Sequence, residues 1–205
     1  MNHYLRSTDN IDWETPAVRE LARGLAGGAS GEVDVARRCY EWVRDEIRHS
    51  GDYRASVTTC RASDVLREGT GWCYAKSHLL AALLRANGIP AGLCYQRLLL
   101  DDDRDVFTLH GLNAVHLREY DWYRVDPRGN KAGVDAQFCP PVERLAWLGD
   151  QPGEVNFPEI LADPEPCIVE CLTTHCGWEA VRANLPDFTM ISSLTDAHLE
   201  SKPHD

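Results

Sequence analysis

Cys73 stands where a glycine-rich turn meets the first turn of the most apolar helical stretch in the sequence. The turn is Gly69-Thr70-Gly71, and the stretch covers residues 73–87. A helix N-terminus presents unpaired N–H groups and the positive end of the helix dipole, and both favour a thiolate over a thiol. The same N–H groups stabilise an oxyanion when a cysteine attacks a carbonyl. The position predicts a nucleophilic cysteine, against the alternative of a buried and inert one.

A nucleophilic cysteine needs a base within hydrogen-bond reach and a third group that orients the base. The sequence offers eight histidines. His78 follows Cys73 on the same helix but lies about 140° around the helix axis, so it faces away. His110 and His116 remain as candidates, with His175 in the last helical stretch as an outsider. The others lie in terminal tails or at the end of a helix far upstream: His3, His49, His198 and His204.

The register of one hairpin decides between the two candidate bases. His110 and His116 lie on the same face of a strand because an even number of residues separates them. Asp126 lies on the returning strand. A hairpin loop at 117–121 would bring His110 to the diagonal from Asp126, whereas a loop at 119–121 would bring His116 there. Local reasoning leaves both registers open.

Helical periodicity places the candidate nucleophile on a central helix. Apolar residues recur at steps of three and four over residues 33–47, which predicts an amphipathic helix. The stretch at 73–87 is apolar nearly all round, so we expect it to be buried. Gly88 and Pro90 are typical stop signals directly after it. The other predicted helical segments are residues 16–26, 63–68 and 168–185.

Strands follow the central helix. We predict them at residues 91–100, 110–118 and 122–128. Helices followed by antiparallel strands indicate an α+β fold, with the buried helix packed on the sheet and further helices towards the C-terminus. Residues 149–166 are rich in proline, glycine and acidic residues and are expected to form a connecting segment. We expect a single domain over residues 1–190 and a polar, disordered tail at 191–205.

The composition disfavours several classes of protein. The 205 residues include 32 acidic and 21 basic ones, giving a net charge of −11, so nucleic acid and anionic membranes are not expected partners. The beginning of the chain lacks an apolar signal segment, and no stretch approaches the ~18 apolar residues of a membrane span. We therefore expect a cytoplasmic protein with reduced cysteines. Nothing in the sequence indicates the oligomeric state.

Three motifs in order carry a family resemblance. They are Gly71-Trp72-Cys73-Tyr74-Ala75-Lys76-Ser77, then Leu84-Arg85-Ala86-Asn87-Gly88-Ile89-Pro90-Ala91, then His110-Gly111-Leu112 with Trp122 and Val125-Asp126-Pro127. This series resembles the core of the transglutaminase-like superfamily of papain-like thiol enzymes, over about residues 30–130. Three motifs at matching spacing are much more specific than any one of them alone.

The resemblance implies a papain-like fold and a catalytic triad. Cys73 would be the nucleophile, His110 the base and Asp126 the group that orients the base. The family motif matches the sequence at His110 and not at His116. Leu112 and Ala114 stand where the family usually has an aromatic and an acidic residue after its histidine, so the substrate groove is expected to differ.

The same resemblance implies thiol-dependent acyl transfer, in which Cys73 attacks an amide or ester carbonyl and forms a thioester. Transfer of the acyl group to water would make the protein a cysteine protease or amidase, and transfer to an amine would make it a transglutaminase. We expect hydrolysis of a peptide or small amide. Amine transfer is the alternative, and the net negative charge of the chain would attract cationic acceptors for it. The segment Arg128-Gly129-Asn130-Lys131 resembles a bacterial branch of the superfamily.

Two other hypotheses compete with catalysis. A catalytically silent scaffold could bind peptides in the same groove, but all three triad residue types are present. A zinc site could use Cys167, Cys171, His175 and Cys176, because Cys171 and His175 would share one helix face. Structural zinc sites usually take close pairs of ligands from two elements, and the sequence has no C-x-x-C pair. We therefore expect no metal and no cofactor.

Overall fold

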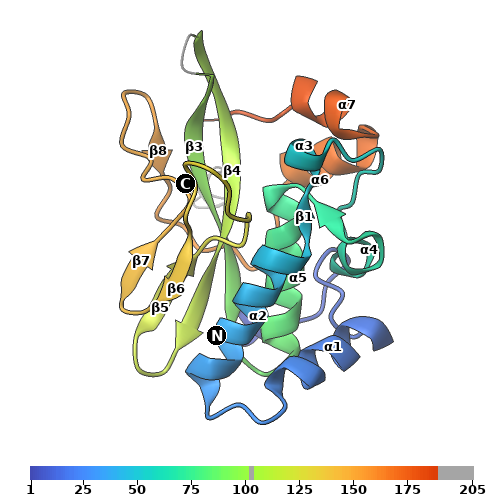
Figure 1. The fold of residues 1–205 in the computed structure, drawn as a ribbon, viewed down its shortest axis with the longest axis vertical. Helices are drawn as coiled ribbons and strands as arrows, with labels where there is room; N and C mark the ends of the chain where they lie inside the picture. The colour runs from blue at the N-terminus through green and yellow to red at the C-terminus, as the bar shows by residue number, and fades with distance from the viewer. Residues whose placement is uncertain (102–103, 189–205) are drawn as a thin grey trace, which may run out of the picture.

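A computed structural model describes residues 1–101 and 104–188, so the predicted tail at 191–205 lies outside the described residues. Helices collect on one side of a four-stranded antiparallel sheet whose strand order is β5-β4-β3-β8, which confirms the predicted α+β class (Figure 1). The elements are η1 (Asn2–Leu5), α1 (Pro16–Ala26), α2 (Glu32–Glu46), β1 (Arg48–His49), α3 (Ser50–Tyr53), α4 (Ala62–Glu68), β2 (Thr70–Gly71), α5 (Cys73–Ala86), β3 (Ala91–Asp101), β4 (Arg104–Leu117), β5 (Asp121–Val125), β6 (Gln137–Cys139), β7 (Val142–Arg144), β8 (Val155–Asn156), α6 (Pro166–Thr174) and α7 (Trp178–Ala183).

The central helix is α5, as the sequence predicts. Its residues are buried from Cys73 to Arg85, because an apolar surface all round must be covered on every side. The sheet strands β3 and β4 cover one side, and α1, α2 and α4 cover the others (Figure 1). The helix ends at Ala86, and Gly88 follows with φ +73°, a left-handed conformation that favours glycine.

The hairpin of β4 and β5 takes the first of the two registers considered above. Leu117 pairs with Asp121, and the pairing continues in step to the end of β5. Extending the ladder by one residue places Asp126 opposite Leu112 and puts His110 on the diagonal. The strand itself stops at Val125, earlier than predicted, so Asp126 lies in the first position of the following turn. β4 begins at Arg104 rather than at His110.

The region after β5 contains short elements that the sequence analysis did not predict. β6 and β7 form a small separate hairpin, and β8 pairs with β3 at the edge of the main sheet. Residues 149–166, expected to be only a connection, therefore contribute an edge strand. These strands have two or three residues each, which is too short for an alternating apolar pattern to be visible.

The helical layer and the sheet approach each other closely beside the N-terminal end of α5. A Cβ atom at Gly111 on β4 would lie 2.8 Å from Tyr74 Cδ1 and 3.1 Å from Tyr74 Cα, so only glycine allows this spacing. The Tyr74 hydroxyl donates to the carbonyl of Leu109, and the Asn113 amide donates to the carbonyl of Ser77. These bonds fix the position of α5 along β4.

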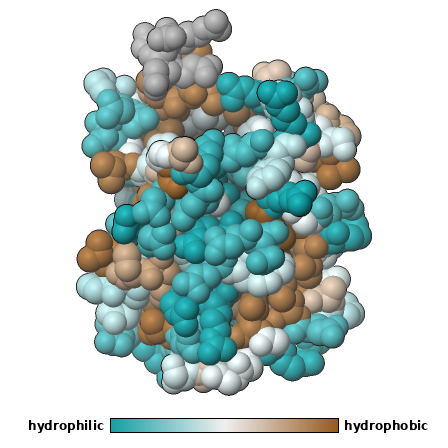
Figure 2. Space-filling model, in the orientation of Figure 1, coloured by the Kyte–Doolittle hydropathy of each residue, from teal (hydrophilic) through white to brown (hydrophobic). Residues whose placement is uncertain are grey.

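The molecular surface is largely polar, with apolar residues in separate patches on the face that Figure 2 shows. Within the part of the chain that the structure describes, every helix is too short or too polar to cross a bilayer. The eight cysteines are all unpaired thiols. The structure therefore rests on its core and its hydrogen bonds and uses no disulfide cross-links among these cysteines.

Candidate active site

A cleft of about 540 Å³ opens at the N-terminal end of α5, between that helix and the β3–β4 hairpin. Cys73 and Tyr74 reach it from α5, and His110 reaches it from β4. The turn after β5 contributes Arg128, and the loop after β7 contributes Trp147. The cleft thus joins elements from both layers of the fold.

Cys73 is the first residue of α5, and only 6% of its surface is exposed. The first amide of the helix with an intrahelical acceptor is that of Lys76, which donates to the carbonyl of Trp72. The amides of Cys73 and Tyr74 therefore belong to the unpaired first turn, where the helix dipole is positive. These amides are available to donate to an oxyanion that forms next to Cys73.

His110 connects the thiol to a buried carboxylate. Its Nε2 lies 2.7 Å from Oδ2 of Asp126, and its ring lines the same cleft as Cys73, whose side chain acts on it. Burial alone would lower the pKa of His110, but the negative charges of Asp126 and Cys73 outweigh burial and raise the pKa to about 10. The histidine is therefore held as an imidazolium between two acidic groups.

Asp126 is completely buried and has a full set of partners. Besides His110, the amide of Arg128 donates to its Oδ1 at 3.0 Å and the amide of Ala146 donates to its Oδ2 at 3.2 Å. Burial would raise the pKa of Asp126, but His110 and these amides lower it below its ordinary value. The Trp147 ring meets the His110 ring edge-on at 4.8 Å between centroids.

The three residues proposed from the sequence as a triad are thus together, and the other candidate bases lie elsewhere. His116 Nε2 lies 3.1 Å from Asp121, and the His116 side chain is 27% exposed near the other end of β4. His78 is buried inside the core with Nδ1 at 2.7 Å from the carbonyl of Cys60. Neither residue lines the cleft.

The sequence matches the transglutaminase-like superfamily over residues 19–127, a span of more than half of the chain that contains Cys73, His110 and Asp126. The chain belongs to the transglutaminase-like superfamily. A comparison with curated proteins gave no match.

Several solved structures are similar to part of this transglutaminase-like chain at low sequence identity. A candidate cysteine protease from Cytophaga hutchinsonii is 19% identical with a TM-score of 0.50, and the alignment covers 61% of this chain and 40% of that one. The periplasmic domain of TgpA from Pseudomonas aeruginosa is 20% identical with a TM-score of 0.45 and coverages of 60% and 45%. Red sea bream transglutaminase is 12% identical with a TM-score of 0.45 and coverages of 57% and 27%. The aligned region spans less than half of each of these structures.

His49 is a residue of the transglutaminase-like cleft that the sequence analysis set aside as distant. The two-residue strand β1 pairs in parallel with β2, so that His49 lies beside Gly71 and next to the turn that precedes Cys73. Its ring meets the Trp72 ring edge-on at 5.3 Å, and the side chain is 8% exposed. Burial and the charge of Arg128 hold the pKa of His49 well below its ordinary value, so the ring is neutral. A two-residue parallel pairing leaves no pattern in the sequence.

An ion network borders the cleft beside His49. Arg128 donates two hydrogen bonds to Asp52, at 2.6 and 2.9 Å, and Lys131 donates a third at 2.8 Å. Burial would raise the pKa of Asp52, but the two cations hold it well below its ordinary value. The network ties α3 to the turn that carries Asp126.

Lys76 lies beneath the site with its ammonium group fully buried in the transglutaminase-like core. Its Nζ donates to the main-chain carbonyls of Arg44 and Ile47, at the end of α2. Burial, reinforced by the charge of Arg128, lowers the pKa of Lys76 to about 7, although Asp126 and other carboxylates oppose this. Near neutral pH this lysine is therefore only partly protonated.

The buried lysine gives the stability of the protein a defined pH dependence. Above pH 7, Lys76 of the folded chain has released its proton. In the unfolded chain the same lysine keeps its proton up to the ordinary lysine pKa of 10.5. Stability therefore rises with pH in this interval, by up to ~1.4 kcal/mol per pH unit. We expect the unfolding free energy of the wild type minus that of Lys76→Met to grow by a few kcal/mol between pH 7 and about pH 10. Denaturant titrations measure this difference, and a constant difference would contradict it.

The alternative metal site does not form as its spacing suggested. α6 ends at Thr174, so Cys171 and His175 do not share a helix face, which corrects the expectation above. The Cys171 thiol donates to the carbonyl of Asn184, and the Cys176 thiol to that of Ser56. Among residues 1–101 and 104–188, no three potential metal ligands come together.

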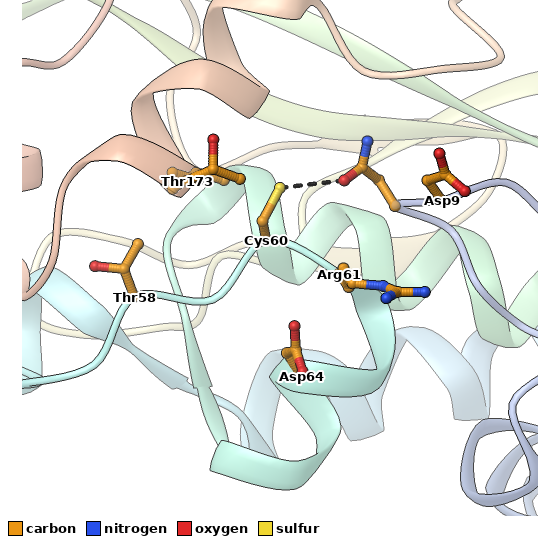
Figure 3. Close-up of a pocket in the computed structure, with 8 residues that line it drawn as sticks. Asp9, Thr58, Cys60, Arg61, Asp64 and Thr173 are labelled. Carbon is orange, nitrogen blue, oxygen red and sulfur yellow. Dashed lines mark hydrogen bonds between the residues drawn. The ribbon is translucent and has the colours of Figure 1, made fainter.

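A second hollow of about 490 Å³ lies away from the triad, between the N-terminal segment, α4 and α6. Figure 3 shows its lining, where the Cys60 thiol donates to the Asn10 side-chain oxygen at 3.3 Å. Burial raises the pKa of Cys60 to about 12, so this thiol stays protonated. No histidine lines this hollow, and the chemistry of the triad is not repeated there.

Proposed function

We propose that the protein is a cysteine hydrolase that cleaves a peptide-like amide by acyl transfer through Cys73. The observation that carries this proposal is the position of His110, which shares a cleft with Cys73 and hydrogen-bonds to the buried Asp126. A nucleophile, a base and an orienting carboxylate in that order are the minimal set for acyl transfer. Membership of the transglutaminase-like superfamily supports the same assignment.

In the first half-reaction, the Cys73 thiolate attacks the substrate carbonyl carbon and forms a C–S bond. The carbonyl π electrons move onto oxygen, and the unpaired amides at the start of α5 stabilise that oxyanion. The imidazolium of His110 gives its proton to the amide nitrogen as the C–N bond breaks. An amine leaves, and the acyl group remains as a thioester on Cys73.

In the second half-reaction, His110 is neutral and accepts a proton from water as the water oxygen attacks the thioester carbon. The C–S bond breaks, the carboxylic acid leaves, and the thiolate–imidazolium pair is restored. Asp126 keeps the imidazole in one tautomer and orientation throughout. Trp147 shields this pair and limits competition by solvent for the hydrogen bond between His110 and Asp126.

Water is favoured over an amine as the acyl acceptor because of the local charge. Although the whole chain is acidic, Arg54, Arg128 and Lys131 line the cleft. Lysine and polyamine acceptors are cations near neutral pH, so these side chains repel them. The attraction of cationic acceptors expected from the net charge therefore does not extend into the cleft.

Acyl-enzyme trapping tests this function. Incubation with 4-nitrophenyl acetate is expected to add one acetyl group at Cys73, found by mass spectrometry after acid quenching, and to release nitrophenol in a burst. Cys73→Ala should show neither, whereas Cys139→Ala, which removes an exposed cysteine, should behave as the wild type. Acetyl transfer to added cadaverine in place of water would favour the transglutaminase alternative. Acetylation spread over the exposed cysteines instead of Cys73 would overturn the proposal.

A further inference from the structure

The candidate active-site cleft has a charge opposite in sign to that of the whole chain. Four basic side chains line it against two carboxylates, while the chain has a net charge of −11. A surplus of one sign inside a concave site acts on a bound molecule more strongly than distant charges, which salt screens. The basic residues are Arg54, Arg128, Lys131 and Arg182, and the acidic ones are Asp52 and Glu154.

Both carboxylates of the cleft are already engaged. Asp52 is shared by Arg128 and Lys131, so two cations face one carboxylate. Glu154 accepts hydrogen bonds from two main-chain amides, at 2.9 and 3.0 Å. These bonds hold the acidic groups in place and leave a positive surplus on the side of the cleft formed by α3 and the turn after β5.

Arg54 is the cation best placed to meet a bound molecule. It ends α3 in a left-handed conformation with φ 52°, and its guanidinium lies 5.4 Å from the ring centroid of Trp178. Among the residues that the structure describes, its side chain forms no ion pair. Stacking on an aromatic ring leaves the planar N–H groups of a guanidinium free to bind a carboxylate.

Apolar side chains complete the walls of the cleft. They come from β3, from the loop after β7 and from the α7 region, and comprise Leu98, Leu99, Leu100, Trp147, Trp178 and Leu185. A molecule that fits this lining has an apolar part and an anionic group. A cationic or wholly polar molecule fits it poorly.

We propose that the cleft selects substrates that carry a carboxylate near the acyl group, and that Arg54 and Lys131 recognise it. This inference rests on the proposed acyl transfer at Cys73. The carboxylate belongs either to an acidic side chain of a peptide or to a free C-terminus, which have the same recognition chemistry. Arg128 supports Lys131 by holding Asp52, and the apolar walls bind the rest of the substrate.

Two alkylating reagents of similar size measure the charge preference without a known substrate. Iodoacetate is an anion and iodoacetamide is neutral, and with both the Cys73 thiolate displaces iodide and forms a thioether. The rate ratio of iodoacetate to iodoacetamide is measured at Cys73 by mass spectrometry and divided by the same ratio at the exposed Cys139. We expect the normalised ratio to exceed one by about tenfold at low salt and to shrink in about 0.5 M NaCl.

Substitutions separate the recognition cations from the imidazolium of His110, which also attracts anions. Arg54→Gln and Lys131→Gln are each expected to lower the normalised ratio by about threefold or more at low salt, with little change in the iodoacetamide rate. Arg67→Gln is the matched control, because it removes one positive charge from an exposed position on α4 outside the cleft. Its ratio should equal that of the wild type.

Matched peptides distinguish the two sources of the carboxylate. N-acetyl-Ala-Glu-Ala-amide, its glutamine and lysine analogues, and the glutamine peptide with a free C-terminus are tested for protection of Cys73 against iodoacetamide. Protection by the glutamate peptide identifies a side-chain carboxylate, and protection by the free acid identifies a terminal one. Both effects should weaken in Arg54→Gln.

The outcomes separate this inference from the proposed function. If Cys73 reacts well with iodoacetamide but shows no anion preference, or if Arg54→Gln and Lys131→Gln leave the preference intact, the recognition proposal is wrong and the acyl-transfer proposal stands. Stronger protection by the lysine peptide than by the glutamate peptide would also overturn the recognition proposal. If Cys73 is no more reactive than Cys139 towards either reagent, both proposals fall.

Discussion

Replacing His110 by alanine is expected to slow the alkylation of Cys73 by iodoacetamide at pH 6 by about 100-fold or more. An ordinary thiol, with a pKa of ~8.5, is ~0.3% ionised at that pH, and a neighbouring imidazolium favours the reactive thiolate form. His110 can supply this pairing because the charges of Asp126 and Cys73 raise its pKa to about 10. Labelling over a series of pH values, resolved by site with mass spectrometry, measures the effect.

Matched variants show whether the effect belongs to this histidine. His116→Ala removes a histidine from the same strand, but one that pairs with Asp121 outside the cleft, and it should leave the labelling of Cys73 unchanged. The exposed Cys139 serves as an internal reference in every variant. Loss of low-pH labelling in His116→Ala, or its persistence in His110→Ala, would contradict the assignment of the base.

Asp126→Asn is expected to affect stability and reactivity together. The carboxylate is fully buried and accepts from His110, Arg128 and Ala146. An asparagine leaves the buried imidazolium of His110 without its counter-charge. Its NH₂ group also faces a hydrogen-bond donor where the carboxylate had an acceptor oxygen, and together these changes cost ~3–5 kcal/mol of unfolding free energy. By analogy with triads in other enzymes, acyl transfer should fall by about 10³–10⁴-fold.

The pH dependence of this loss identifies the charged pair. The pKa of His110 is raised from its ordinary 6.5 to about 10, so its contribution is complete below pH 6.5 and disappears as the pH rises through 10. The pKa of Asp126 is lowered from 3.8, so its contribution is present above pH 3.8. The stability difference between wild type and Asp126→Asn should therefore be largest between about pH 4 and 6.5 and should shrink towards pH 10. A difference that stays flat up to pH 10 would exclude an ionic pair.

Helix patterns and motif order predicted much of what positions the proposed triad. The sequence predicts a buried helix at residues 73–87 because apolar residues cover every side of it, and α5 spans Cys73–Ala86. It also predicts the order of helices and antiparallel strands. The choice of His110 needed the family resemblance, because local reasoning permitted two hairpin registers. Only the structure places Leu117 opposite Asp121 and so brings His110 next to Asp126.

The remaining parts of the site depend on pairings too short to leave a sequence pattern. His49 reaches the cleft through a two-residue parallel pairing of β1 with β2, and β8 joins the sheet with two residues. The charge of the cleft could not be predicted from the sequence either. Arg54 and Lys131 are 77 positions apart in the chain, and only the tertiary fold brings them to one cleft. Averages over the chain, such as a net charge of −11, carry no information about such local groupings.

The proposed nucleophile and base belong to different halves of the fold, the helical layer and the sheet, which meet closely at Gly111. Cys73 belongs to the helical half and His110 to the sheet half. Gly111 has no side chain, and this allows the two halves to pack closely at Tyr74. Neither half contains a working thiol–imidazole pair by itself. The proposed thiol–imidazole pair therefore exists only where α5 and β4 are packed together, so a substitution that separates this helix from this strand is expected to disrupt the pair without touching either residue.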